Sequence, residues 1–211
     1  MLIAELAELS DTPPATVKYY VREGLLPAGA RERGNRTSYD ESHVHRLRLI
    51  RAMLEVGKLS VSSVAAVLAA LDDQTTTIGE TFAVAQNALS RDAVSTVSEP
   101  SPESIARVDA LVERVGWPPC GDNVGVRIVA QTIDGFAKAG HPLADDYLDR
   151  YAEAAAVVAK ADLDAVTPGA PGTDDEADLT ELMVVGTVLG DTLSLGLRRI
   201  AQATLTAERN L

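Results

Sequence analysis

The sequence predicts a mostly α-helical protein, in which short N-terminal helices and a small β-hairpin precede a longer all-helical segment. Apolar residues recur at helical spacing through most of the chain. Aromatic residues make up only 4%, so the core should be aliphatic. A stretch rich in Gly and Arg, residues 28–39, interrupts the helical pattern. Hydrophobic residues make up 46%, which is enough for a core and too many for a disordered chain.

The first two expected helices are short and joined by a tight turn. Apolar spacing predicts a helix over residues 2–9. A second helix over residues 14–23 begins at a Pro-Pro pair, which suits a first helical turn. Thr12 is the expected N-cap of this helix, and Gly24 is expected to end it.

The second helix has two chemically different faces. Val17 and Tyr20 share the inner face, whereas Lys18 and Arg22 lie four residues apart on the outer one. Two short helices, the second with a basic outer face, are typical of a helix-turn-helix.

The segment that follows is expected to form a hairpin, called the wing, with Gly34-Asn35 at its turn. Helical periodicity then resumes. Further helices are expected over residues 41–56, capped by Asp40, and over residues 61–71, capped by Ser60.

The rest of the chain is predicted to be entirely helical. Helices are expected at 80–91, 102–115, 123–139, 143–165 and 177–208. His141-Pro142 is the expected start of the fourth of these. Leu182–Ile200 is apolar nearly all round, which favours a mostly internal helix that also helps dimerisation. The expected organisation is a first domain at 1–71, a connecting helix and linker at 72–100, and an all-α domain at 101–211.

Charge is distributed unevenly along the chain. The net charge is −12, yet residues 14–51 hold eight Lys and Arg against four Asp and Glu. Residues 72–211 hold ten against twenty-three. Affinity for DNA depends on the local charge that neutralises phosphates, so a small basic segment attached to an acidic one is compatible with a DNA-binding protein.

Several function classes find no support in the sequence. The single Cys120 excludes an internal disulfide and a cysteine-rich metal site, and we expect no metal, no cofactor and a cytoplasmic location. No signal peptide is expected, and Asp191, Arg198 and Arg199 argue against a membrane span in the most apolar helix. No catalytic residues are proposed, because residues 72–211 contain no phosphate-binding loop or catalytic triad.

The segment Val17-Lys18-Tyr19-Tyr20-Val21-Arg22-Glu23-Gly24-Leu25-Leu26-Pro27 closely resembles the signature of the MerR family of transcriptional regulators. The arginine-rich wing, Tyr39-Asp40 and the run from Arg46 to Ile50 are similar to the same family. The resemblance covers about the first 70 residues. Two positions depart from the family pattern: Lys18 stands where Arg is usual, and Asn35 where the wing commonly has Tyr.

The resemblance implies a winged helix-turn-helix that acts as a homodimer on a near-palindromic promoter. Family members typically bend and untwist double-stranded promoter DNA so that RNA polymerase can engage both promoter elements, and such deformation costs several kcal/mol. The DNA-binding residues that we expect are Thr16, Lys18, Tyr19, Tyr20, Arg22, Arg31, Arg33, Arg36, Tyr39, Arg46 and Arg48.

The all-helical segment is expected to bind a small organic effector. Trp117, Phe136, Tyr147 and Tyr151 are the candidate pocket residues, although aromatic side chains in so aliphatic a domain also suit a plain core. One alternative is a protein-interaction adaptor with an acidic helical domain, in which DNA binding is secondary. Another is an enzyme fused to a DNA-binding module, which no catalytic motif supports.

Overall fold

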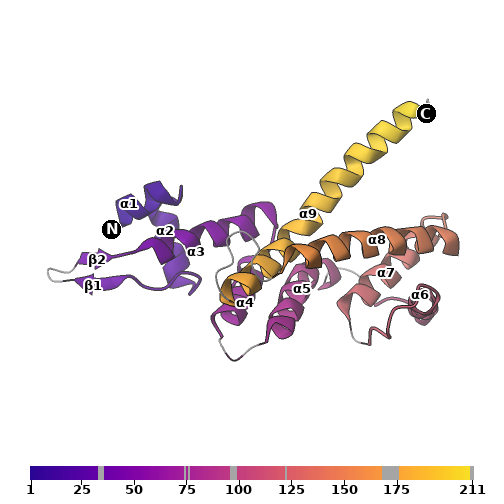
Figure 1. Cartoon of the computed structure of the whole chain (residues 1–211), viewed down its shortest axis with the longest axis horizontal. Helices are drawn as coiled ribbons and strands as arrows, with labels where there is room; N and C mark the ends of the chain where they lie inside the picture. The colour runs from indigo at the N-terminus through magenta and orange to yellow at the C-terminus, as the bar shows by residue number, and fades with distance from the viewer. Residues whose placement is uncertain are drawn as a thin grey trace. The chain divides into compact units, whose positions relative to one another are not determined.

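The computed structural model describes residues 1–32, 36–73, 75, 77–95, 99–121, 123–167 and 176–209, with the backbone alone at 91–95 and 176. The described residues form helices and one two-stranded sheet (Figure 1). In chain order the elements are α1 (Ile3–Leu9), α2 (Pro14–Arg22), β1 (Ala30–Glu32), β2 (Arg36–Ser38), α3 (Glu41–Arg51), the π-helix η1 (Ala52–Val56), α4 (Val61–Asp72), α5 (Ile78–Ser95), α6 (Pro102–Arg114), α7 (Val124–Lys138), α8 (Asp145–Ala165) and α9 (Glu176–Glu208).

The fold class agrees with the sequence prediction, but the packing divides the chain differently from the expected boundaries. One compact unit combines Met1–Thr77 with Val184–Leu211, and the other is Ile78–Met183. Helix α5, expected as part of a linker, belongs to the second unit, whereas most of α9 belongs to the first.

Local signals explain most helix ends in the first unit. The Asp40 carboxylate accepts hydrogen bonds from the backbone N–H of Ser42 at 3.0 Å and of His43, which caps α3 as predicted. Hydrogen bonds from the Ser42 hydroxyl and from the His43 side chain hold the pKa of Asp40 below its usual range. Gly24 has a φ of +74° and follows the C-cap of α2, also as predicted.

The predicted N-cap of α2 and the predicted start of α8 are wrong, although α2 begins at Pro14 as predicted. The N-cap of α2 is Pro13, and the buried Thr12 hydroxyl donates instead to the Ser10 carbonyl at 3.0 Å. Helix α8 begins at Asp145 rather than at His141-Pro142. In both cases the residues that were expected to start the helix lie in the connection before it.

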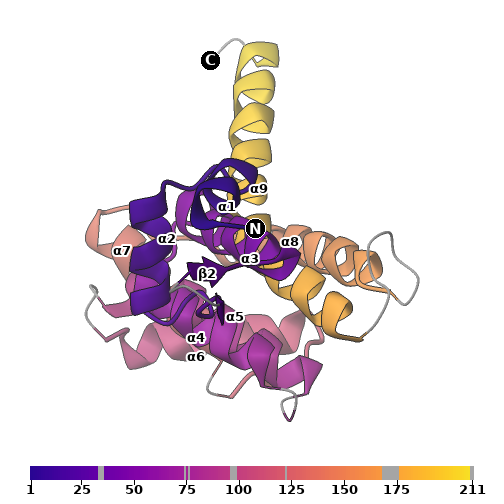
Figure 2. The same cartoon turned by 90° about the vertical axis from the view of Figure 1, so that its left-hand side faces the viewer.

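The core of the first unit forms where α1 to α4 converge, and the start of the C-terminal helix adds to it. Figure 2 views this unit from the hairpin end. Leu6, Val17, Leu47 and Val64 are fully buried, as are Val184 and Val188 from α9, among others. The Thr192 hydroxyl donates to the Val56 carbonyl at 3.2 Å. A Cβ at Gly57 would collide with Val188, so α9 approaches this backbone closely.

Helix α9 departs from the expectation of a mostly internal helix. Only its first part in this unit is buried, through Val184 and Val188. Leu193, Leu197 and Ile200 are 63%, 57% and 65% exposed. The sequence predicted a mostly internal helix that also helps dimerisation, whereas the described residues leave the later part of α9 uncovered.

The second unit is built around α6, α7 and α8. Its buried cluster contains Val108, Leu111 and Val112 from α6, Ala130 and Ile133 from α7, and Leu148 and Ala152 from α8. The half-buried Asp134 of α7 binds the N-terminus of α6 through hydrogen bonds. It accepts hydrogen bonds from the Ser101 N–H and hydroxyl, both at 2.7 Å, and from the Ser104 hydroxyl at 2.6 Å.

These hydrogen bonds to Ser104 and Ser101 lower the pKa of Asp134 to about 2. The ionised form is therefore favoured by folding, and its stabilisation should be present above pH 4 and disappear as the pH falls towards 2. We expect Asp134→Asn to lower the thermal midpoint at pH 7, and the difference from the wild type to shrink between about pH 4 and pH 2. Asp162→Asn, at an exposed position of α8, is the control. A difference independent of pH would contradict this account.

Candidate nucleic-acid interface

Helix α2 presents two cationic side chains to solvent. Val17 and Tyr20 are buried on its inner face, which fixes the rotation of the helix about its axis. Lys18 and Arg22 consequently lie on the exposed outer face. Lys18 has no ion-pair or hydrogen-bond partner among the described residues. Its ammonium group is therefore available to an anion.

Arg22 is oriented by its neighbours and remains exposed. Its guanidinium lies over the Tyr19 ring, 5.2 Å from the centroid, which is within the range of a cation–π interaction. Its Nε also donates to the Glu23 carboxylate at 3.2 Å. The side chain is nevertheless 71% exposed, so these weak surface contacts leave most of the guanidinium accessible.

The wing forms a two-stranded antiparallel sheet. Its register pairs Ala30 with Ser38, Arg31 with Thr37 and Glu32 with Arg36. Directly opposed residues share a face and successive residues alternate, so Arg31 and Arg36 point to opposite faces. Both are exposed and lack a polar partner among the described residues. Arg33 lies outside the described residues.

A close approach at Gly29 positions the base of the wing. A Cβ at Gly29 would collide with the Ser38 carbonyl and would lie 2.7 Å from the Thr37 side chain. The Tyr39 backbone accepts from the N-terminal ammonium of Met1 at 2.7 Å and donates to the Met1 carbonyl at 2.9 Å. The wing is thus anchored where it leaves the helices.

Two of the predicted DNA-binding residues are occupied inside the protein. Tyr20 is only 8% exposed, and burial raises the pKa of its hydroxyl. Arg46 donates two hydrogen bonds to the Asp72 carboxylate at 2.7 and 2.6 Å, and one from Nε to the Leu25 carbonyl at 3.1 Å. With its side chain 15% exposed, Arg46 braces α3 against the end of α4.

The remaining predicted residues differ in exposure. Arg48 is exposed, although its Nη2 donates to the Leu9 carbonyl at 3.0 Å. Thr16 and Tyr19 are half-buried on α2. Tyr39 is half-buried and meets the His43 ring edge-on, with the ring centroids 5.2 Å apart.

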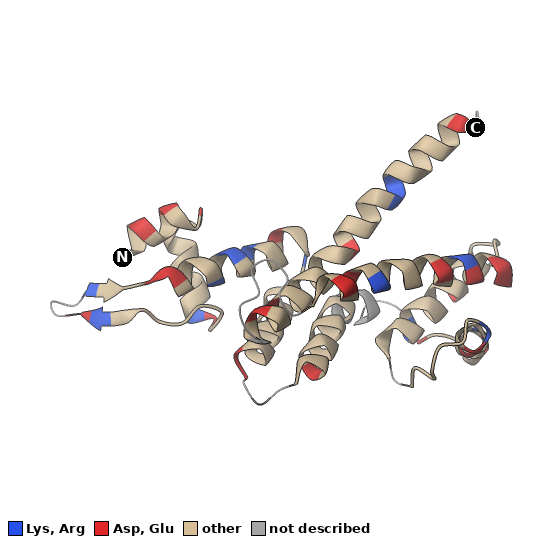
Figure 3. Ribbon diagram, viewed as in Figure 1, with Lys and Arg blue, Asp and Glu red and all other residues tan. Residues whose placement is uncertain are grey.

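Among the described residues of α2 and the wing, four exposed cations thus remain: Lys18, Arg22, Arg31 and Arg36. We call these four residues the basic surface. Figure 3 shows basic residues on both strands of the wing and along α3. Sequence position alone could not separate the exposed Arg22 from the internally paired Arg46, because the partner of Arg46 lies 26 residues away.

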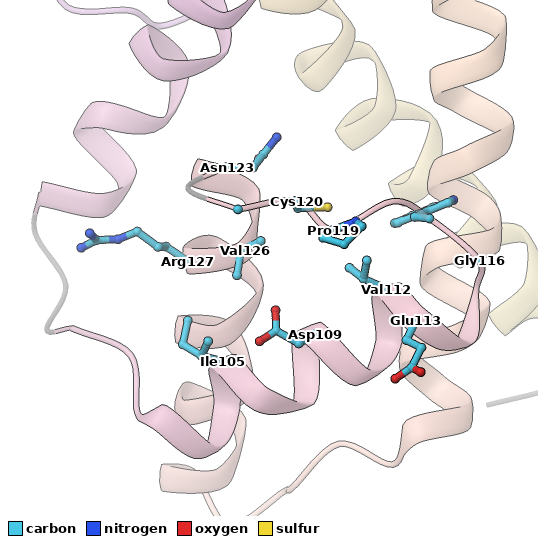
Figure 4. Close-up of a pocket in the computed structure, with 12 residues that line it drawn as sticks. Ile105, Asp109, Val112, Glu113, Gly116, Pro119, Cys120, Asn123, Val126 and Arg127 are labelled. Carbon is cyan, nitrogen blue, oxygen red and sulfur yellow. The ribbon is translucent and has the colours of Figure 1, made fainter.

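The four predicted effector residues do not gather at one site. Trp117, Phe136, Tyr147 and Tyr151 are 39%, 40%, 40% and 45% exposed, so none belongs to the core. Tyr147 and Tyr151 pack together with centroids 4.8 Å apart, one helical turn apart on α8. The second unit has a cavity beside α6, at the connection between α6 and α7 (Figure 4), and of the four residues only Trp117 lines it. Among the residues that the structure describes, no three His, Cys, Asp or Glu gather to hold a metal ion.

Comparison with known proteins identifies relatives of both the N-terminal segment and the whole chain. The profile of the MerR HTH family regulatory proteins matches residues 1–71. SCO5550 from Streptomyces coelicolor A3(2), provisionally described as a transcriptional regulator, has a solved structure that is 32% identical, with a TM-score of 0.71. The match covers 99% of this chain and 97% of that one.

PbrR691 from Ralstonia metallidurans CH34, a transcription regulator solved with Lead(II), is 26% identical with a TM-score of 0.40. That match covers 61% of this chain and 96% of PbrR691. Among curated proteins, none matches the chain. The profile match at the N-terminus and the full-length similarity to SCO5550 show that the chain belongs to the MerR family of transcriptional regulators.

Proposed function

We propose that the protein is a homodimeric, sequence-specific DNA-binding regulator that acts on a near-palindromic promoter. The observation that carries this proposal is the basic surface. Its four cations are exposed on a helix-turn-helix and its wing, while the chain as a whole carries a charge of −12. Positive charge confined to one surface of an acidic protein suits an anionic partner.

In the proposed complex α2 enters the major groove, as the second helix of a helix-turn-helix does. Lys18 and Arg22 then reach base edges or phosphates, and Tyr19 supports Arg22 from its inner side. Arg31 and Arg36 lie on opposite faces of the wing, so it can contact backbone on one face and the flanking minor groove on the other.

A gel-shift experiment with the full chain and a fragment of its own upstream promoter tests this proposal. We expect specific binding whose affinity falls steeply with salt, because each neutralised phosphate contributes about 0.9 to the slope of log K against log salt. Four cations per protomer predict a slope of several units for a dimer. Absence of a shift at low salt, or a slope near zero, would contradict the proposal.

The exposed part of α9 supports a second copy as partner. Leu193, Leu197, Ile200 and Thr204 recur at three- and four-residue spacing and therefore form one stripe along the helix. Asp191, Arg198 and Arg199 lie on the other half of the helix. An apolar stripe of this kind pairs with an identical one about a two-fold axis, which buries the same residues in both protomers.

A lipid membrane is the alternative partner of this apolar stripe. Helix α9 is long and apolar enough to cross a bilayer by length and composition. Its three central charges would then lie in hydrocarbon, at a cost of about 2.5–3.5 kcal/mol each on insertion scales. Pairing with a second copy leaves those charges in water and is the arrangement we propose, consistent with a cytoplasmic regulator.

The regulator is proposed to respond to a small organic effector and to act on RNA polymerase through promoter DNA. An effector can shift the equilibrium between two conformations of the protein only by as much as its affinities for them differ. The second unit is the proposed location of the effector, because it contains a cavity large enough for one.

A further inference from the structure

The short π-helix η1, which follows α3 directly, departs from the hydrogen-bond pattern of an α-helix. The Gly57 N–H donates to the Ala52 carbonyl at 3.0 Å, five residues back instead of four. The Leu59 N–H donates to the Met53 carbonyl at 3.1 Å, six residues back, whereas the corresponding bond of a Schellman end spans five. If each N–H bonded to the next carbonyl along the chain, η1 would continue α3 as an ordinary α-helix. The two registers thus differ by a single residue.

Helix α9 contacts the two residues that a change of register would move. The Thr192 hydroxyl donates to the Val56 carbonyl at 3.2 Å. The fully buried Val188 lies so close to Gly57 that a Cβ there would collide with it. A shift of one residue would turn Val56 and Gly57 by about 100° around the helix axis and move them by about 1.5 Å along it. Both contacts with α9 would then break, so a seated α9 favours the π register.

The other end of η1 holds the turn between α1 and α2. Arg51, the N-cap of η1, donates from Nη1 to the Ser10 carbonyl at 3.2 Å, to the Asp11 carboxylate at 3.0 Å and to the Asp11 carbonyl. From within η1, the Glu55 carboxylate accepts from Nε of Arg51 at 2.8 Å and from Nη2 at 3.1 Å. The guanidinium is therefore held between the turn and η1, and its orientation depends on where η1 places Glu55.

Backbone strain is found at both ends of this chain of contacts. Among the described residues, the non-glycine residues with positive φ are Asp11, at +49°, and Lys58, at +57°. Such values are uncommon outside glycine and persist only where the surrounding structure holds them, often in segments that switch between conformations. Asp11 is held by Arg51, and Lys58 directly follows Gly57, which α9 contacts.

We propose that η1 is a joint with two registers, and that α9, seated on Val56 and Gly57, holds it in the π register and so keeps Arg51 on the helix-turn-helix turn. When α9 leaves this seat, η1 returns to an α-helix, Glu55 shifts relative to Arg51, and the turn that positions α2 is held less firmly. An element with two discrete arrangements, biased from both ends, is what energetic coupling through a fold requires. The inference deepens the proposed function, on which its consequence for DNA binding rests, because it describes how the basic surface is regulated.

The register of η1 can be measured without DNA. Scalar couplings across hydrogen bonds, recorded by NMR on the full-length protein, identify the carbonyl that accepts from the Gly57 N–H. We expect Ala52 in the wild type, and a shift towards Met53 in two variants that change α9 alone, Thr192→Val and Val188→Ala. Thr192→Val is close in shape to the wild type and lies at an exposed position, so it should fold even if Val188→Ala does not.

The control is Thr132→Val, which removes a hydroxyl that donates to the Ile128 carbonyl within α7 at 2.8 Å. It should leave Ala52 as the acceptor. A shift in either α9 variant would support the proposal. Retention of Ala52 in every folded α9 variant would overturn it.

A double-mutant cycle tests the connection from α9 to the turn. Thr192→Val should lower affinity for promoter DNA by about threefold to tenfold, as expected for one lost hydrogen bond. Glu55→Gln should lower it as well, because it weakens the hold on Arg51. The double variant should lose less than the product of the two single effects, since both act through η1. Effects that multiply fully would show that α9 and Glu55 act independently and would overturn the proposal.

Failure of this inference can be distinguished from failure of the proposed function. If the protein does not bind promoter DNA, the shift of the Gly57 acceptor in the α9 variants still appears. If the joint is absent, the wild type still binds promoter DNA, while the acceptor of Gly57 does not respond to substitutions in α9.

Discussion

Replacement of Lys18 and Arg22 by alanine should reduce affinity for promoter DNA by about 100-fold or more at physiological salt. Both side chains are exposed on the outer face of α2, and a dimer loses four cations in this variant. Contact with a base edge is worth about 1–3 kcal/mol for a good bidentate pair, and lost phosphate contacts add to it. The slope of affinity against salt should decrease as well. Gel shifts at several salt concentrations measure both effects.

The matched control replaces Arg150 and Lys160 by alanine. These residues lie on α8 and pair with Asp146 and Asp164 one turn away, so the variant removes the same charge from the other unit. It should bind DNA with nearly unchanged affinity. If the Lys18 and Arg22 variant also binds normally, α2 is not the recognition helix, and the alternative of a protein-interaction adaptor gains support.

Replacement of Leu197 and Ile200 by glutamate should convert the proposed dimer to a monomer. Their side chains are 57% and 65% exposed and occupy the centre of the α9 stripe. Four buried carboxylates per dimer would face one another in this variant, and a buried unpaired charge costs several kcal/mol. Sedimentation equilibrium gives the mass directly. DNA affinity should fall with it, because a monomer contacts only one half-site.

Leu195→Glu is the control for this experiment. Leu195 is 45% exposed and lies on the opposite side of α9 from the stripe, so it should leave the dimer intact. A wild-type protein that is monomeric at micromolar concentration would contradict the proposed dimer. Binding of the wild type to neutral lipid vesicles, abolished by the same two glutamates, would instead assign the stripe to a membrane.

The sequence was sufficient for elements whose signals are local. The carboxylate of Asp40 and the positive φ at Gly24 act within one helical turn, so residue type predicts where α3 begins and α2 ends. The predicted helices agree with the observed ones to within a few residues for the same reason. The π-helix at Ala52–Val56 was missed, because its apolar spacing resembles that of an ordinary helix.

Features that depend on tertiary partners could not be predicted in this way. Arg46 and Arg22 are both basic residues in the family-like segment. Arg46 forms an ion pair with Asp72, whereas the side chain of Arg22 is mostly exposed to solvent. Helix α9 was predicted to be mostly internal, because an apolar sequence shows which residues need cover but not whether the same chain or a second copy supplies it.

The return of the chain to its first unit at Val184 limits how this regulator can be divided. The family profile ends at residue 71, but Val184 and Val188 are fully buried in the same unit, and Val188 sits against Gly57. A fragment that stopped at the profile boundary would lack α9 and would therefore expose the apolar surface beside Met53 and Gly57. We therefore expect a fragment of residues 1–77 to be less stable than the same unit in the whole chain. The segment that completes this unit begins at Val184 and is synthesised more than a hundred residues later.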